Sequence, residues 1–105
     1  SADSEVCIFE DHMDMGLARE FMNFMLEKGA KICAVFCRKD EKEYRYVIGS
    51  KSQNMQELGK YLYQSFSGKG GGKPDMIQGT IQGNQQDIEA AFHANAKKGK
   101  KCESE

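Results

Sequence analysis

Residues 67–79 read Ser67-Gly-Lys-Gly-Gly-Gly-Lys-Pro-Asp-Met-Ile-Gln-Gly79, and they hold five of the eleven glycines and the only proline of the chain. The three consecutive glycines at 70–72 have no side chain to pack, and they lose much conformational freedom when they become ordered. A small domain keeps such a run where its backbone must turn or must approach another molecule closely. We therefore predict a glycine-rich surface loop here.

Two lysines, Lys69 and Lys73, flank the three glycines. Exposed backbone N–H groups beside two ammonium charges suit an anion, most simply a phosphate or a nucleic-acid backbone. A plain flexible loop would have the same composition. However, Pro74-Asp75 predicts a turn and residues 76–81 predict a strand, so the loop is held at both ends. This favours a binding role over a mere linker.

The segments before residue 40 predict a strand, a helix and a second strand. Residues 5–9 and 31–37 are apolar runs, and the second is continuous enough for a strand covered on both faces. Between them, apolar residues recur at spacings of three and four, which predicts a helix at 15–28 that Asp11 or Asp14 caps and Gly29 ends. Its apolar face comprises Leu17, Ala18, Phe21, Met22, Met25 and Leu26.

A third strand is predicted at 44–48, joined to the second by a short charged turn as an antiparallel hairpin. Here Arg45 lies between Tyr44 and Tyr46. This pattern fits stacking on nucleotide bases, and it fits simple alternation across a sheet equally well.

Two more helices flank the glycine stretch. The first, capped by Ser52 or Asn54, has an apolar face made of Met55, Leu58, Tyr61, Leu62 and Phe66. Gly59 within it indicates close approach to a neighbouring element. The second begins near Asn84 or Gln85, and its apolar face comprises Ile88, Ala91, Phe92 and Ala96.

These elements predict an α/β fold, a mixed sheet of about four strands with two or three helices in the order β-α-β-β-α-β-α. We expect one domain at residues 1–96, because 105 residues support a single core. Residues 97–105 are expected to be a lysine-rich disordered tail. No apolar run approaches the ~18 residues of a membrane span. No signal peptide is visible, and we expect a cytoplasmic protein that contacts no membrane.

The net charge of −1 is unevenly distributed. Residues 1–59 hold 8 basic and 11 acidic side chains (−3), residues 60–101 hold 7 and 3 (+4), and residues 102–105 add −2. The positive part contains the glycine stretch, which favours an anionic partner. The four cysteines, Cys7, Cys33, Cys37 and Cys102, form no closely spaced ligand pairs, so buried thiols explain them better than a zinc site.

The glycine stretch fits none of the common nucleotide-binding motifs. Pro74 follows Lys73 where a Walker A sequence needs serine or threonine, and the predicted strand follows where that motif needs a helix. No strand–glycine–helix unit surrounds it, as a dinucleotide-binding fingerprint requires. No nucleophile elbow or cysteine–histidine pair is visible either.

The sequence from Gly68 to Gly79 resembles the glycine-rich signature of the C-terminal domain of alanyl-tRNA synthetases and of free-standing alanyl-tRNA editing proteins. The same domain accompanies the DHH phosphoesterases. The likeness spans roughly residues 30–96. It implies the non-catalytic C-terminal module of a longer protein, an aminoacyl-tRNA hydrolase or an alanine–tRNA ligase. Its partners would be the tRNA for alanine and a catalytic or editing domain that precedes this chain.

The resemblance also implies the residues that would contact nucleic acid. These are Lys69, Gly70, Gly71, Gly72, Lys73, Pro74, Asp75, Gln78 and Gly79, with no catalytic residue, metal or other cofactor in this chain. In the phosphoesterase branch a histidine follows the glycine run, whereas Lys73 stands here. Two alternatives remain open: the substrate-binding domain of a DHH-type phosphoesterase, and a module that forms homodimers through a sheet edge or the methionine-rich helix.

Overall fold

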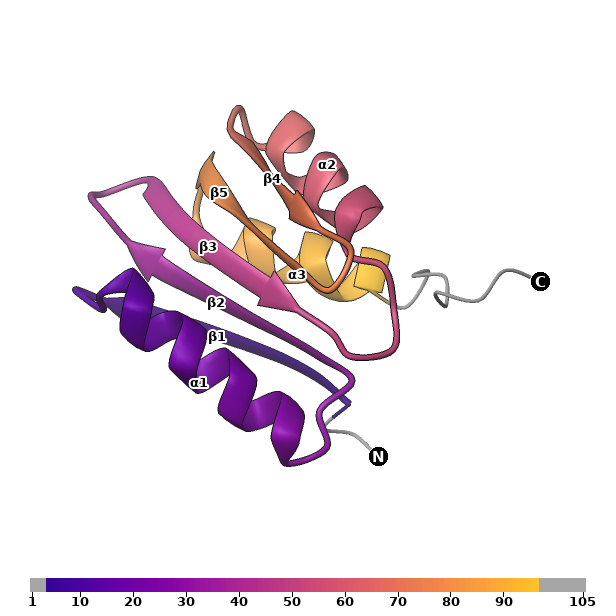
Figure 1. The fold of residues 1–105 in the computed structure, drawn as a ribbon. Coiled ribbons are helices and arrows are strands. Elements are labelled where there is room, and N and C mark those ends of the chain that lie inside the picture. Colours follow the sequence, from indigo (N-terminus) through magenta and orange to yellow (C-terminus); the bar gives the residue numbers. More distant parts are fainter. Residues whose placement is uncertain (1–3, 97–105) are drawn as a thin grey trace.

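Five strands form one mixed sheet in the order β1-β2-β3-β5-β4, in a computed structural model that describes residues 4–96 (Figure 1). β1 and β2 pair in parallel, and every other neighbouring pair is antiparallel. The strands are β1 (Glu5–Asp11), β2 (Ile32–Arg38), β3 (Glu43–Gly49), β4 (Lys69–Lys73) and β5 (Met76–Gln82). The helices are α1 (Met15–Glu27), α2 (Gln56–Ser65) and α3 (Gln85–Ala96). The tail expected at 97–105 lies outside the described residues.

The helices cover the two faces of the sheet unequally. α1 lies on one side, against β2 and β3, and α2 and α3 lie on the other side (Figure 1). β2 is buried on both faces: Cys33, Val35 and Cys37 pack in the cluster that contains α1, and the intervening residues pack in the other cluster. The continuous apolar pattern of β2 is thereby explained, and the prediction of a strand covered on both faces is confirmed.

Side chains cap the starts of α1 and α3, as the sequence predicts. The carboxylate of Asp14 accepts a hydrogen bond from Leu17 N at 3.0 Å, so Asp14 and not Asp11 caps α1. Gly29 follows α1 with φ 112°, in the left-handed region that favours glycine. The side chain of Asn84 accepts from Asp87 N at 2.8 Å at the start of α3. Asn54 accepts from Gln56 N at 2.8 Å, but the N-cap residue of α2 is Met55, so the predicted cap by Ser52 or Asn54 is wrong.

The predicted apolar faces are wrong at two residues. Leu17 is 52% exposed and Tyr61 is 42% exposed. Each helix buries a narrow stripe with a spacing of three or four residues, such as Ala18, Met22 and Leu26 in α1. Leu17 precedes Ala18 and Tyr61 precedes Leu62 by one residue, a rotation of about 100° that turns each away from the sheet.

The base-stacking interpretation of the tyrosines in β3 is also wrong. Tyr44 and Tyr46 are 1% and 0% exposed, and they point into the core beneath α2 and α3. Both lie in a row of aromatic rings, in which Phe9 contacts Phe36 and Tyr44 and Phe36 contacts Tyr46. Arg45 lies between them on the opposite face and is exposed. Alternation across the sheet therefore explains the pattern.

The described helices include no segment long and apolar enough to cross a membrane.

Candidate nucleic-acid interface

The glycine stretch is a strand and not a loop, which corrects the prediction and raises the strand number from about four to five. It forms β4, which pairs with β5 through a hairpin that turns at Pro74-Asp75. Within the described residues no strand pairs with its outer edge, and Lys69–Lys73 are exposed throughout. Every second backbone N–H and C=O of such an edge points away from the sheet.

Gly68 and the glycines of β4 alternate between two roles. Side chains at Gly68, Gly70 and Gly72 would collide with the backbone of β5; a Cβ at Gly70, for example, would lie 2.7 Å from the carbonyl oxygen of Gln78. A Cβ at Gly71, by contrast, would have no atom within 4 Å. Glycines at 68, 70 and 72 are therefore required by the close approach of the two strands, whereas Gly71 leaves open space beside the exposed backbone.

Hydrogen bonds from the neighbouring segments hold the hairpin in place. The side-chain amide of Gln56 donates to Gly72 O at 3.0 Å, which ties the start of α2 to β4. Backbone bonds complete the attachment: Gly68 N to Tyr63 O, Gln82 N to Phe66 O, Met55 N to Pro74 O and Ser50 N to Asp75 O, all between 2.7 and 3.0 Å. The prediction that this stretch is held at both ends is confirmed.

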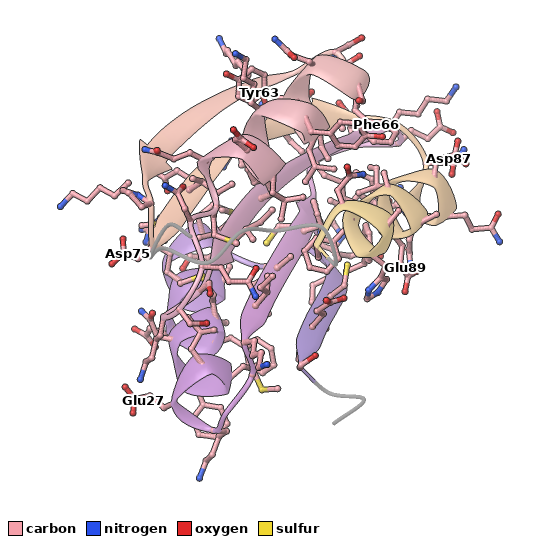
Figure 2. All side chains as sticks on the ribbon, turned by 90° about the vertical axis from the view of Figure 1, so that its right-hand side faces the viewer. Glu27, Tyr63, Phe66, Asp75, Asp87 and Glu89 are labelled. Carbon is pink, nitrogen blue, oxygen red and sulfur yellow. The ribbon has the colours of Figure 1, made fainter. Side chains whose placement is uncertain are left out.

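Four of the predicted residues share a hollow with α1. Gly72, Lys73, Asp75 and Gln78 line a depression of about 450 Å³, together with Arg19 and Asn23 from the helix. The guanidinium of Arg19 donates from Nη1 to Gln78 Oε1 at 3.2 Å. Figure 2 shows Asp75 at the turn, at the periphery of the molecule. Sequence reasoning missed Arg19, because 59 positions separate it from Gln78 and only the sheet brings them together.

The other side of the hairpin faces α2. A smaller hollow of about 230 Å³ lies there, lined by Tyr46, Lys60, Tyr63 and Gly71 among others. Figure 2 labels Tyr63 at α2, where it is half-buried against the core. The hydroxyl of Tyr46 is buried and has no hydrogen-bond partner among the described residues. Burial and the nearby Tyr63 raise the pKa of Tyr46 to about 12, so this hydroxyl stays protonated at neutral pH.

The nine predicted residues all lie in the β4–β5 hairpin, but they are not equally accessible. Lys69 to Asp75 and Gln78 are exposed, and Gly79 is half-buried. A Cβ at Gly79 would lie 2.6 Å from Gly70 Cα and 2.7 Å from the Tyr46 hydroxyl oxygen. Gly79 therefore makes room inside the hairpin, and its glycine identity is explained without a ligand.

The cysteines lie away from this surface. Cys33 and Cys37 are buried, as predicted, on the α1 side of β2, and Cys7 is half-buried. Burial raises the pKa of Cys33 to about 11. Within residues 4–96, no three histidine, cysteine, aspartate or glutamate side chains come close enough to hold a metal ion. Cys102 lies outside the described part of the chain.

Comparisons with known proteins agree with this architecture. The fold is similar to that in the crystal structure of the C-Ala domain from Aquifex aeolicus alanyl-tRNA synthetase, with a TM-score of 0.70, 20% sequence identity, and coverage of 88% of this chain and 87% of that one. No curated protein sequence matches the chain. The model of the DHHA1 domain family matches residues 3–98, nearly the whole sequence. The chain therefore belongs to the DHHA1 domain family.

Proposed function

We propose that this chain is a non-catalytic module that binds tRNA, and that it forms the C-terminal part of an alanyl-tRNA synthetase-like or alanyl-tRNA editing protein. The observation that carries the proposal is the form of β4, an exposed edge strand with a bare glycine backbone at its centre and a lysine at each end. Its family and its likeness to the C-Ala domain support the same assignment.

In this proposal β4 meets the sugar–phosphate backbone of the tRNA. Lys69 and Lys73 are four residues apart in one strand, a separation of about 13 Å, so each ammonium group neutralises a different phosphate. Between them, those backbone N–H groups of residues 70–72 that point away from β5 donate to phosphate or ribose oxygens, and Gly71 allows that approach. Pro74, Asp75 and Gln78 then lie at the margin of the contact, where Asp75 accepts from a ribose hydroxyl.

The rest of the proposal concerns the parent protein. The chemistry, hydrolysis of a mischarged aminoacyl-tRNA or ligation of alanine to tRNA, belongs to a domain N-terminal to this chain. The tRNA is the one for alanine, and the location is the cytoplasm. The module itself uses no cofactor, since phosphate recognition by lysine and backbone amides needs none.

The test is a filter-binding salt titration of the chain with a tRNA transcript for alanine. The double substitution Lys69→Ala/Lys73→Ala is expected to weaken binding and to make its salt dependence shallower by up to about one unit of slope per lost phosphate contact. Gly71→Val is expected to weaken binding without changing that slope as much, because it blocks the backbone and removes no charge. Equal binding by all three proteins, with equal slopes, would remove the residues on which the proposal rests.

Two other functions compete for the same strand. The substrate-binding domain of a DHH-type phosphoesterase would take a short oligonucleotide on β4, and Lys73 in place of the expected histidine counts against it. A dimerisation module would use the unpaired outer edge of β4, which is long enough to pair with a second copy. An elution volume that shifts with protein concentration and a failure to bind tRNA would together favour the dimer.

A further inference from the structure

On the side of the sheet that carries α1, the helix packs against β2 and β3 and leaves β5 and β4 without a helix over them (Figure 1). Arg45 of β3 is exposed at the margin of this uncovered region. Val47 and Met76 pack in the α1-side cluster, so they identify which residues of β3 and β5 face this side. Residues two positions apart along a strand share a face, which places Arg45, Gln78 and Thr80 on it as well.

The register aligns cations across this region. Arg45 pairs with Thr80, and Thr80 pairs with Lys69, so the arginine and the lysine end one row across the three strands. Lys73 pairs with Met76 in a parallel row four residues away along β4. Neighbouring strands lie about 4.8 Å apart, so the side chains of Arg45 and Lys69 begin about 10 Å apart.

A further cation reaches this region from α1. Arg19 donates to Gln78 Oε1 at 3.2 Å and lines the hollow that Lys73 also lines. Gln78 lies between Val47 and Gly71 in the register, so the guanidinium is held next to the middle of the open region. A neutral amide positions the arginine without cancelling its charge, whereas a carboxylate there would cancel it.

None of the four cations forms an ion pair within the described part of the chain. Among the described residues, the ion pairs involve Arg38, Lys39, Lys51 and His93, and none involves Arg19, Arg45, Lys69 or Lys73. This local excess occurs although residues 4–96 hold 13 acidic and 11 basic side chains. Asp75 is the one carboxylate that lines the hollow. Glu10 and Glu43 lie on the same face of β1 and β3, near Arg45, so the excess of cations is concentrated over β5 and β4 and is not a property of the whole domain.

We infer that the nucleic-acid backbone lies across the open α1-side face of β5 and β4 and reaches Arg45 of β3, where Arg19 and Arg45 bind phosphates together with Lys69 and Lys73, and where Gln78 positions Arg19. The inference rests on the proposed function and specifies which side of β4 the tRNA occupies. The α2 side is less suited to a polyanion. Its hollow contains a single cation, Lys60, beside apolar and aromatic groups, and Asp87 and Glu89 belong to α3 on that same side of the sheet (Figure 2).

The experiment measures binding of the chain to a tRNA transcript for alanine at several salt concentrations. Arg19→Ala/Arg45→Ala removes two charges from the face, and Lys60→Ala/Lys31→Ala removes two charges elsewhere and serves as the matched control. The arginine pair is expected to lose affinity at least several-fold and to lower the salt slope by about two units. The control pair is expected to bind within twofold of the wild type.

Gln78→Glu separates the role of Arg19 from simple loss of a side chain. It keeps the shape of the residue and places a carboxylate beside the guanidinium, so it is expected to weaken binding about as much as Arg19→Ala does. Gln78→Ala, which removes the acceptor but adds no charge, is expected to have a smaller effect. Thermal melting of each variant shows whether the fold is retained, and neither arginine contributes to a buried cluster.

The outcomes separate the inference from the proposed function. If Arg19→Ala/Arg45→Ala binds like the wild type while Lys69→Ala/Lys73→Ala binds weakly, the tRNA does not lie on this face and the tRNA-binding function stands. If Arg19→Ala/Arg45→Ala and the control Lys60→Ala/Lys31→Ala lose the same affinity, binding depends only on net charge and the inference is overturned. If the wild type does not bind tRNA at all, the proposed function fails and the inference fails with it.

Discussion

The hydroxyl group of Tyr46 occupies the space that a side chain at Gly70 would need. Tyr46 belongs to β3, which is separated from β4 by β5, and its hydroxyl reaches past Gly79 to the inner side of β4. A Cβ at Gly70 would collide with this oxygen, and one at Gly79 would lie 2.7 Å from it. Gly79 in β5 and Gly70 in β4 thus leave room for the buried side chain of Tyr46 from β3.

Gly70→Ala is expected to destabilise the protein by about 1–3 kcal/mol, because the added methyl group overpacks a site closed by Tyr46 and by the backbone of Gln78. Gly71→Ala is the matched control. With no atom within 4 Å of its Cβ, it is expected to change stability by less than about 0.5 kcal/mol, or to raise it slightly by restricting the unfolded chain. Urea denaturation measures both, and equal free energies of unfolding would contradict the alternation of roles in β4.

Tyr46→Phe is expected to raise the free energy of unfolding by about 1 kcal/mol. The hydroxyl is buried with no partner among the described residues, so folding removes its hydrogen bonds to water without replacing them. Tyr61→Phe removes an exposed hydroxyl and is expected to change nothing measurable. A loss of stability in Tyr46→Phe would mean that the hydroxyl has a partner, and the same urea series shows it.

The two substitutions are also expected to be coupled. In the Tyr46→Phe background, Gly70→Ala meets the backbone of Gln78 but no longer meets the hydroxyl, so its cost is expected to be smaller than in the wild type. Residues in direct contact commonly show coupling of about 0.5–3 kcal/mol in a double-mutant cycle. Additive costs would show that the hydroxyl does not restrict position 70.

Stability is expected to fall in alkaline solution. Burial raises the pKa of Cys33 to about 11, and burial together with Tyr63 raises the pKa of Tyr46 to about 12. The folded state therefore keeps protons that the unfolded chain releases above about pH 8.5 and 10, respectively. Their contribution is complete below pH 8.5 and decreases as pH rises toward 11–12, by up to about 1.4 kcal/mol per pH unit for each group.

Urea denaturation between pH 8 and pH 11 checks this expectation. Cys33→Ala and Tyr46→Phe each remove one of the two groups, so each is expected to flatten the decline over its own pH range. If the free energy of unfolding declines with pH in both variants as it does in the wild type, other groups cause the decline. Cys7, whose pKa burial and Glu89 raise to about 12, is the first of these to examine.

Asp14→Ala is expected to cost about 0.5–2 kcal/mol, because Leu17 N at the start of α1 loses its acceptor. Asp11→Ala is the comparison: it removes an exposed ion pair with Arg38, which is worth about 0–1 kcal/mol. Thermal melts of the two variants check this difference. A larger cost for Asp11→Ala would place the important contact in the Asp11–Arg38 pair and not in the helix cap.

Much of the fold could be predicted from local patterns. The helix at 15–28 followed from apolar spacing and from a cap and a terminal glycine, and the strand at 31–37 followed from an unbroken apolar run. The prediction of a loop at the glycine stretch is wrong, because a run of glycines has the same composition in a turn and in an edge strand. The feature that identifies a strand is that every second residue, Gly68, Gly70 and Gly72, has no room for a side chain next to the backbone of β5. This alternation can be recognised only once the pairing of β4 with β5 is known.

Apart from β4, the order of the elements could be predicted from the sequence, as could most apolar residues of the core and the lysines beside the glycine backbone, because each depends on residues close together in the chain. The tertiary structure is needed to place β3, β5 and β4 side by side, with Arg45 and Lys69 in one row and Arg19 beside Gln78. The physical reason is that pairing between distant strands is set by hydrogen bonding and burial over the whole sheet, and no short segment contains that information.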